Sequence, residues 1–155
     1  MHVTRINHVS IFATDLEESA RFYEAVFGAE RIPTPRFPQP VLWLKLGDQQ
    51  LHLFEQPGNE PTLQHHFGVD VDDFERIYRV AKERGILDIE AFGAALRGHP
   101  AGWAHMYLRD PAWNLVEVCW PDASTLDPAI LAEMTPLESM VHQEGDAAVA
   151  TLYHS

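Results

Sequence analysis

An internal repeat is the feature of this sequence that most limits the folds available to it. Residues 7–11 (Asn-His-Val-Ser-Ile) and 65–69 (His-His-Phe-Gly-Val) have the composition of short strands. Each is followed at the same distance by an aspartate, Asp15 or Asp73, that begins a helical pattern of apolar residues. Aspartate is a favoured N-cap because its carboxylate accepts hydrogen bonds from the first helical N–H groups. The sequence therefore predicts two copies of a strand–helix unit.

Each helical pattern ends near a glycine, Gly28 in the first copy and Gly85 in the second, as is common at helix C-termini. A loop and two strand-like segments follow each helix. The paired segments are 41–46 and 49–55 in the first copy and 103–108 and 114–120 in the second. Helix plus mostly antiparallel strands, twice, predicts an α+β fold. The expected division is module one at 1–55, a linker at 56–64, module two at 65–120 and an extension at 121–155.

The charge balance excludes several classes of partner. The 155 residues include 11 Lys and Arg against 23 Asp and Glu, so the net charge is −12 and basic residues cannot dominate a surface. We therefore expect no nucleic-acid and no membrane partner. The first residues lack the pattern of a signal peptide, and the single cysteine, Cys119, cannot form an internal disulfide. These features predict a cytoplasmic protein.

Alternation along the predicted strands places polar side chains on one face of each. Side chains at positions i and i+2 of a strand share a face, and in these strands one face is an aliphatic row. The opposite face carries one polar residue in each of four strands, namely His8, His52, His66 and Glu117. If the two copies pack as equivalent halves, these four side chains converge inside one concave sheet.

These four side chains have a structural and a functional interpretation. A single histidine in a strand is more often a core or surface residue than a ligand. The shared position and face in both copies nevertheless favour a common role. Two imidazoles and one carboxylate suit Fe(II), and Mn(II), Ni(II) or Zn(II) can occupy the same set. The remaining coordination positions would accept a small-molecule substrate or an oxidant.

Three motifs on these strands resemble those of a known superfamily. They are Asn-His-Val-Ser around His8, His-His-Phe-Gly-Val around His66 and Asn-Leu-Val-Glu-Val around Glu117. With the repeat, they resemble the vicinal oxygen chelate superfamily, which includes glyoxalase I, fosfomycin-resistance transferases, methylmalonyl-CoA epimerase, bleomycin-binding proteins and extradiol ring-cleaving dioxygenases. The resemblance covers residues 3–120. It implies, for a domain at 1–120, two βαβββ modules forming a cupped mixed sheet around a divalent metal.

Two details favour the type I extradiol dioxygenase branch. His99, Tyr107 and Glu117 lie in a stretch that resembles the signature of that branch. His52 precedes His66 at the spacing where those enzymes place an acid–base histidine. The resemblance therefore implies Fe(II)-dependent ring cleavage of a catechol-like aromatic, with O₂ as the oxidant.

The same resemblance implies a role for each site residue. His8, His66 and Glu117 would hold the metal, His52 would move protons, and Tyr107 would hydrogen-bond the bound catechol. Further candidates for the substrate pocket are Ser10, Phe54, His99 and His105. The four remaining histidines, expected to be incidental, are His2, His65, His142 and His154.

Two alternatives stay open, because Arg97 and Trp113 depart from the extradiol signature. A glyoxalase-type lyase or isomerase would remove a proton next to a carbonyl while a metal stabilises the enediolate. Such enzymes commonly have a metal-bound glutamate in each module. In module one of this chain the corresponding residue is His52, which weakens this alternative. A non-catalytic binding protein, of the kind that confers resistance, would need no metal triad, so the intact set of ligands argues against it.

Residues 121–155 form an acidic extension that carries half of the net charge and contains no Lys or Arg. Asp127-Pro128 predicts an N-cap followed by proline at the first helical position. Pro136 is expected to end that helix and to start a second one through Met140. The resemblance implies a homodimer, which the extension could help to form, although a monomer with the extension folded back fits the residues equally well.

Overall fold

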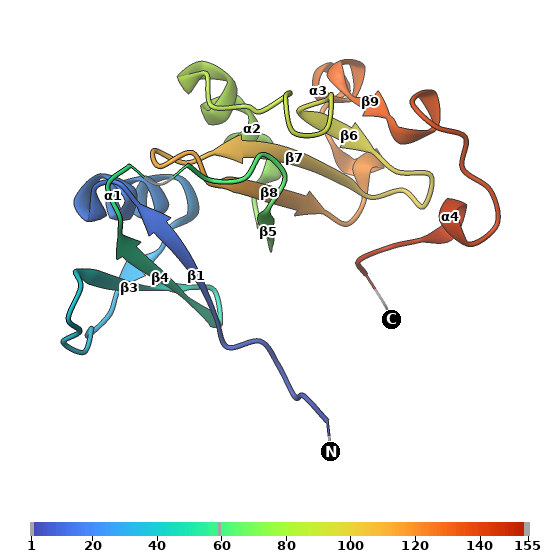
Figure 1. Cartoon of the computed structure of the whole chain (residues 1–155). Helices are drawn as coiled ribbons and strands as arrows, with labels where there is room; N and C mark the ends of the chain where they lie inside the picture. Colours follow the sequence, from blue (N-terminus) through green and yellow to red (C-terminus); the bar gives the residue numbers. More distant parts are fainter. Residues whose placement is uncertain (1, 59, 154–155) are drawn as a thin grey trace. The chain divides into compact units, whose positions relative to one another are not determined.

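The computed structural model describes residues 2–58 and 60–153, which fold into two compact units (Figure 1). Unit 1 comprises Met1–Phe67 and Arg109–Asn114, and unit 2 comprises Gly68–Leu108 and Leu115–Ser155. The division between them falls inside a strand rather than in the expected linker at 56–64. The turn at 109–114 belongs to unit 1, and the acidic extension belongs to unit 2.

Unit 1 contains one helix and a four-stranded mixed sheet. Its elements are β1 (His8–Ala13), α1 (Leu16–Phe27), β2 (Glu30–Arg31), β3 (Val41–Leu46) and β4 (Gln49–Glu55). The strand order is β1-β4-β3-β2, with β1 parallel to β4 and β3 antiparallel to β4. The predicted hairpin is confirmed, with both of its strands at the expected residues.

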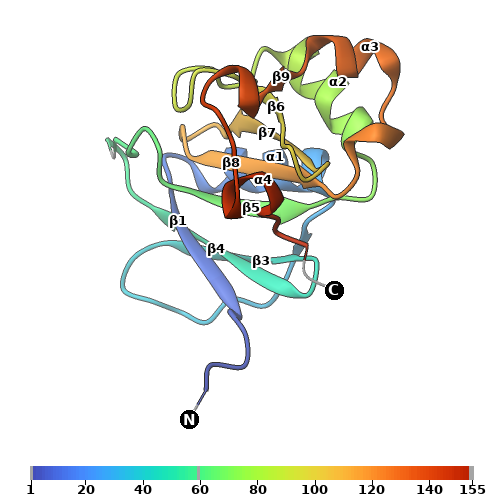
Figure 2. The same ribbon diagram turned by 90° about the vertical axis from the view of Figure 1, so that its right-hand side faces the viewer.

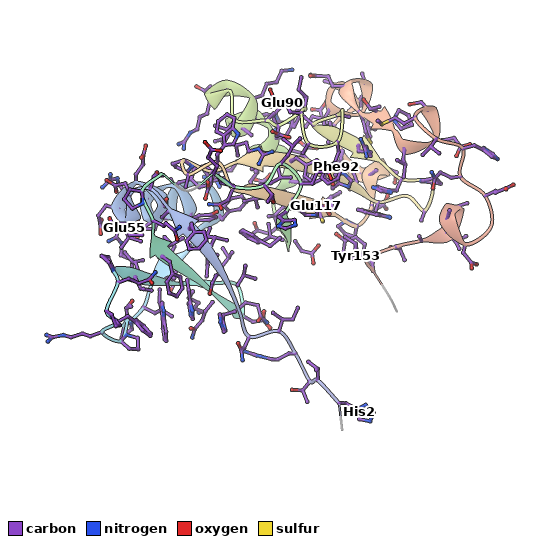
Figure 3. The ribbon with its side chains drawn as sticks, viewed as in Figure 1. His2, Glu55, Glu90, Phe92, Glu117 and Tyr153 are labelled. Carbon is purple, nitrogen blue, oxygen red and sulfur yellow. The ribbon has the colours of Figure 1, made fainter. Side chains whose placement is uncertain are left out.

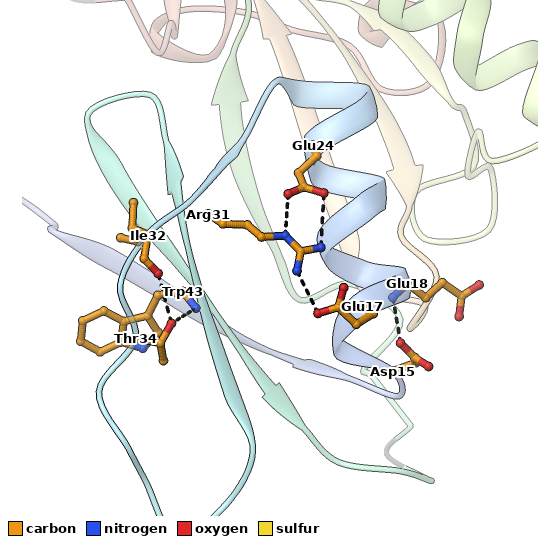
Figure 4. A network of polar contacts seen from close by, with 8 residues as sticks. All are labelled: Asp15, Glu17, Glu18, Glu24, Arg31, Ile32, Thr34 and Trp43. Carbon is orange, nitrogen blue, oxygen red and sulfur yellow. Dashed lines mark hydrogen bonds and ion pairs between the residues drawn. The ribbon is translucent and has the colours of Figure 1, made fainter.

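Arg31 ties the short strand β2 to α1 (Figure 4). Its guanidinium donates from Nε to Glu24 at 2.7 Å and from Nη1 to Glu17 at 2.8 Å, and both carboxylates lie on α1. In the chain that follows, Thr34 Oγ1 donates to the Ile32 carbonyl and accepts from the Trp43 N–H at 2.9 Å. These bonds hold the start of the loop between β2 and β3 against β3.

The second module repeats the arrangement with a five-stranded sheet, most of which lies in unit 2. Its elements are β5 (His66–Asp70), α2 (Phe74–Arg84), β6 (Leu96–Gly98), β7 (Ala104–Arg109), β8 (Leu115–Trp120) and β9 (Thr135–Pro136). The first two residues of β5 and the last residue of β7 belong to unit 1. The strand order is β5-β8-β7-β6-β9. The α+β class is confirmed, but the strands form two sheets, one for each module, instead of one. Each first strand pairs with the last strand of its own hairpin, so that each module completes its own sheet.

The predicted helix boundaries are confirmed in both units. The N-cap carboxylate accepts a hydrogen bond from the N–H three residues on, at 2.8 Å for Asp15 and 3.0 Å for Asp73. The glycine that ends each helix, Gly28 or Gly85, adopts the left-handed conformation with φ of 65°. Only glycine takes this conformation without a steric cost, which explains why both helices end there.

The acidic extension packs on unit 2. Its first helix, α3 (Pro128–Glu133), begins at the predicted N-cap Asp127 and lies beside α2 (Figures 1 and 2). Tyr78 of α2 donates to Glu133 of α3 at 2.9 Å. The expected second helix is a single 3₁₀ turn, Leu137–Ser139. Because Met140 beyond it is exposed, no buried apolar face stabilises a longer helix there.

The rest of the extension consists of a 3₁₀ turn ahead of α3, Ala123–Thr125, and a short last helix, α4 (Asp146–Val149). Among the residues that the structure describes, no helix has the length and apolar character needed to cross a bilayer. His154 lies outside the described residues.

The buried carboxylate of Asp110 attaches the turn at 109–114 to helix α1 of unit 1. Tyr23 on α1 is fully buried and donates through its hydroxyl to Asp110 at 2.9 Å. Asp110 also accepts from the backbone N–H groups of Ala112 and Asn114. Burial raises the pKa of Asp110, and these hydrogen bonds oppose that rise. The turn also contains Trp113, one of the two residues that depart from the extradiol signature, which has a positive φ of 70°.

We predict that Tyr23→Phe lowers the free energy of unfolding by about 1.5–3 kcal/mol, because it removes a hydrogen bond to a buried charged group. Chemical denaturation in urea measures the loss. The matched control is Tyr78→Phe, which removes a tyrosine–carboxylate bond near the surface and should cost less than about 1 kcal/mol. Equal losses in the two variants would contradict the role assigned to Asp110.

Candidate active site

In unit 1 a stack of rings surrounds His52. Because β4 lies between β1 and β3, His52 has a neighbour on each side. The His8 ring stacks on it with a centroid separation of 4.5 Å, and the Trp43 ring stacks on it at 4.1 Å. His8, Ser10, His52 and Phe54 occupy alternate positions of their strands, as the alternation predicted. Trp43 was not predicted as a site residue, although its strand pairs it directly with His52.

His52 is buried, and its Nε2 lies 2.9 Å from Gln50 Oε1. Burial, together with the neighbouring His8, lowers the pKa of His52. A neutral imidazole can accept a proton as well as donate one, whereas the protonated ring can only donate. The environment of His52 therefore favours the form that a general base requires.

The two predicted histidine ligands have matching hydrogen bonds. His8 Nδ1 is bonded to Asn7 Oδ1, and His66 Nδ1 lies 2.7 Å from the Gln64 carbonyl oxygen. Donation from Nδ1 to an oxygen selects the tautomer in which Nε2 carries a lone pair. Metal-binding histidines are commonly oriented by such a bond. Both rings therefore have the hydrogen bonding that suits a ligand.

In unit 2 the buried carboxylate of Glu117, on β8, accepts two hydrogen bonds from side chains. Cys119 Sγ donates to Oε1 at 3.1 Å, and the Tyr107 hydroxyl bonds to the same carboxylate. Burial raises the pKa of both Tyr107 and Cys119, and the charge of Glu117 adds to it. Both groups are therefore protonated donors at neutral pH.

Gly68, on the neighbouring strand β5, faces this carboxylate. A Cβ atom at Gly68 would lie 4.0 Å from Glu117 Oε1 and 3.9 Å from Cys119 Sγ. Glycine therefore leaves space beside the carboxylate that a larger side chain would fill. The sequence motif around His66 contained this glycine, but alternation alone did not identify what it faces.

A row of aromatic rings lies beside Tyr107 in unit 2; Figure 3 labels Phe92, at one end of this row, and Glu117. His99 stacks on Trp103 with a centroid separation of 3.5 Å, and its Nε2 lies 3.0 Å from His105 Nδ1. The His105 ring meets Tyr107 edge-on at 4.7 Å, and Phe92 stacks on Tyr107 at 4.8 Å. The structure thus brings together three of the predicted site residues of module two.

Arg97 is a charged residue that alternation did not assign to the site. It is buried on β6 directly opposite His105, and its Nη2 donates to the Phe92 carbonyl at 2.6 Å. Burial, and next the charge of Arg97, lower the pKa of His99 to about 4. An arginine next to a glycine in a short segment usually indicates a surface position, which is why the sequence did not indicate its burial.

The predicted metal ligands are divided between the two units. His8 and His66 belong to unit 1, and Glu117 belongs to unit 2. In the part of the chain that the structure describes, no three His, Cys, Asp or Glu side chains are grouped so as to hold a metal ion. His142, one of the histidines expected to be incidental, lies in the extension and bonds to Glu138.

Comparisons with known proteins support the fold. The profile of the glyoxalase/bleomycin resistance protein/dioxygenase superfamily matches residues 5–118. Human mitochondrial methylmalonyl-CoA epimerase is 27% identical over 116 residues, which are 65% of this chain and 66% of the human protein. The mouse epimerase is 27% identical over 128 residues, with 74% and 71% covered. The chain therefore spans about two thirds of the human relative's length.

Two solved structures have the same fold. Lactoylglutathione lyase from Agrobacterium tumefaciens is 27% identical, with 76% of this chain and 94% of that chain covered and a TM-score of 0.58. A fosfomycin resistance protein from Listeria monocytogenes, solved with Mn(II), is 13% identical. Its match covers 79% of this chain and 96% of that chain with a TM-score of 0.65, and it supports the fold alone.

We predict that the stability of this protein falls on acidification and that His99 accounts for part of the fall. Because the pKa of His99 is about 4 in the folded state and that of an unfolded histidine is about 6.5, the unfolded chain binds the proton more readily. The free energy of unfolding should therefore decrease as the pH is lowered from about 6.5 to about 4. His99→Phe should make this decrease smaller in urea denaturation at several pH values. Identical pH profiles for the two proteins would refute the role of His99.

Proposed function

The chain belongs to the glyoxalase/bleomycin resistance protein/dioxygenase superfamily, and from that premise we propose that it is a metal-dependent isomerase or lyase. It would move a proton at a carbon atom next to a carbonyl group. The observation that carries this proposal is the ring-stacked, buried His52, whose lowered pKa keeps a neutral base on the polar face of unit 1. The epimerase and the lyase among its relatives support the same reaction class.

We propose that His8, His66 and Glu117 hold a divalent metal ion. The donor set fits, because both imidazoles are hydrogen bonded through Nδ1 and Gly68 leaves space beside the Glu117 carboxylate. Two nitrogens and one carboxylate accept Fe(II), Mn(II), Ni(II) or Zn(II). A bound ion would act as a Lewis acid and stabilise the negative charge that develops on the carbonyl oxygen of the substrate.

The other residues of the two faces would position the substrate and move its proton. His52 would accept the proton from the carbon atom and return it, since burial and stacking between two rings limit its motion and keep it neutral. Tyr107 would turn its single hydroxyl proton from the Glu117 carboxylate to an oxygen of the substrate. The aromatic row of Phe92, His99 and Trp103 would exclude water from the apolar part of the substrate.

The relatives indicate the class of substrate to be tested. One acts on a coenzyme A thioester and another is a lyase of a glutathione thioester, as their names state. We therefore propose a small thioester or hemithioacetal with an acidic hydrogen next to its carbonyl group.

A second candidate is the extradiol cleavage of a catechol-like aromatic by Fe(II) and O₂. The hydrogen bond between Tyr107 and Glu117 favours it, because that branch is expected to place a tyrosine beside its metal-binding glutamate. A neutral His52 would also suit the acid–base step of that reaction. The two candidates share the metal ligands and differ in substrate, oxidant and product.

We predict that Mn(II) or Zn(II) binds with a stoichiometry of one ion per chain in titration calorimetry. His66→Ala and Glu117→Gln should each weaken binding by more than about 100-fold, since lesser losses of 10- to 100-fold follow from changes in supporting residues alone. The matched control is His65→Ala, the adjacent exposed histidine, which should bind as the wild type does. Unchanged affinity in the His66 and Glu117 variants would refute the ligand assignment.

We predict that the metal-loaded protein exchanges the hydrogen next to the carbonyl group of methylmalonyl-CoA in D₂O, or converts the hemithioacetal of methylglyoxal and glutathione. His52→Asn should lower kcat about 10²- to 10⁴-fold, the range of a lost general base, while retaining the metal. His142→Asn serves as the control, since this histidine lies in the extension. Oxygen uptake with catechols and Fe(II), with neither exchange in methylmalonyl-CoA nor conversion of the hemithioacetal, would replace the first candidate by the dioxygenase.

A further inference from the structure

The end of the acidic extension crosses the polar face of unit 2. Trp103 Nε1, just ahead of β7, donates to the Ala150 carbonyl at 3.0 Å. The Tyr153 hydroxyl donates to Asp70 Oδ1, at the end of β5, at 2.6 Å. Because β8 lies between β5 and β7 in the sheet, residues 150–153 run across β8, the strand that carries Glu117.

Both attachment points lie on the same side of the sheet as Glu117. Gly68 faces Glu117 and Cys119, so Asp70, two residues further along β5, faces that side as well. Trp103 stacks on His99 in the aromatic row of that face. Burial and the hydrogen bond to Asp70 raise the pKa of Tyr153, so its hydroxyl is a protonated donor at neutral pH.

The crossing segment is held at its two ends and has little buried surface of its own. None of the four residues of α4, which leads into it, is buried. Leu152, between the two attachment points, is 56% exposed. A segment with so little apolar burial opens at a low cost in free energy compared with the unfolding of the whole unit.

We propose that residues 150–153 form a removable strap over the part of the polar face that contains Glu117 and Cys119. The hydrogen bond between Tyr153 and Asp70 is its latch. With the latch closed the strap shields this end of the face from solvent, and with the latch open it admits a small molecule. The inference rests on the proposed function in one respect, namely that this face is the substrate site.

The buried thiol of Cys119 reports strap opening directly, because it is the only cysteine in the chain. The rate of its reaction with a neutral maleimide is measured on the full-length protein without metal or substrate. Tyr153→Phe and Asp70→Ala should each raise this rate about tenfold, the effect of losing an exposed hydrogen bond of about 1.4 kcal/mol. The double variant should react no faster than either single variant, since both remove one bond.

The matched control is Tyr78→Phe, which removes the tyrosine–carboxylate bond between α2 and α3 and should leave the labelling rate unchanged. Unfolding midpoints in urea are measured for every variant. Labelling rates equal to the wild type in both latch variants would overturn the proposal, as would an increase in Tyr78→Phe of the same size. Because labelling needs neither metal nor turnover, a protein without the proposed activity can still confirm the strap.

Discussion

In each module the first strand pairs with the last, β1 with β4 and β5 with β8, and the remaining strands add to that pair. This pairing places His8 beside His52 in one unit and Gly68 against Glu117 in the other. Because side chains alternate along a strand, a shift of one residue would turn these groups to the aliphatic face. The leucines of β4 on that face are fully buried, so the core and the site depend on the same register.

Burial controls the protonation of the site residues in both units. It keeps the pKa of His52 and His99 low, and it keeps the Tyr107 hydroxyl and the Cys119 thiol protonated beside the Glu117 carboxylate. A neutral base such as His52 can accept a proton from a carbon atom next to a carbonyl group, and a protonated donor such as Tyr107 can hydrogen-bond an oxygen that gains negative charge. The same groups would serve a catechol, which is why reaction class depends on the metal and substrate rather than on the residue types.

Local signals in the sequence were sufficient for the two long helices and the two hairpins of this fold. Asp15 and Gly28 bracket the first helix because capping depends on a few adjacent residues, and alternation assigned His8 and His52 to one face. The contacts of Asp110 with Tyr23, and of Tyr153 with Asp70, could not be predicted. They join segments far apart in the chain, and no periodic pattern specifies which tail residue meets which strand.

The strand β9 gives the acidic extension a role beyond covering the core. It pairs in parallel with β6, with Thr135 opposite Arg97 and Pro136 opposite Gly98, and so occupies the open edge of the five-stranded sheet. An uncovered edge strand offers a template on which another chain can pair. A two-residue strand that ends in proline, which has no N–H group, offers almost none. The extension therefore protects the sheet against edge-to-edge aggregation, and its negative charge adds repulsion between copies of the chain.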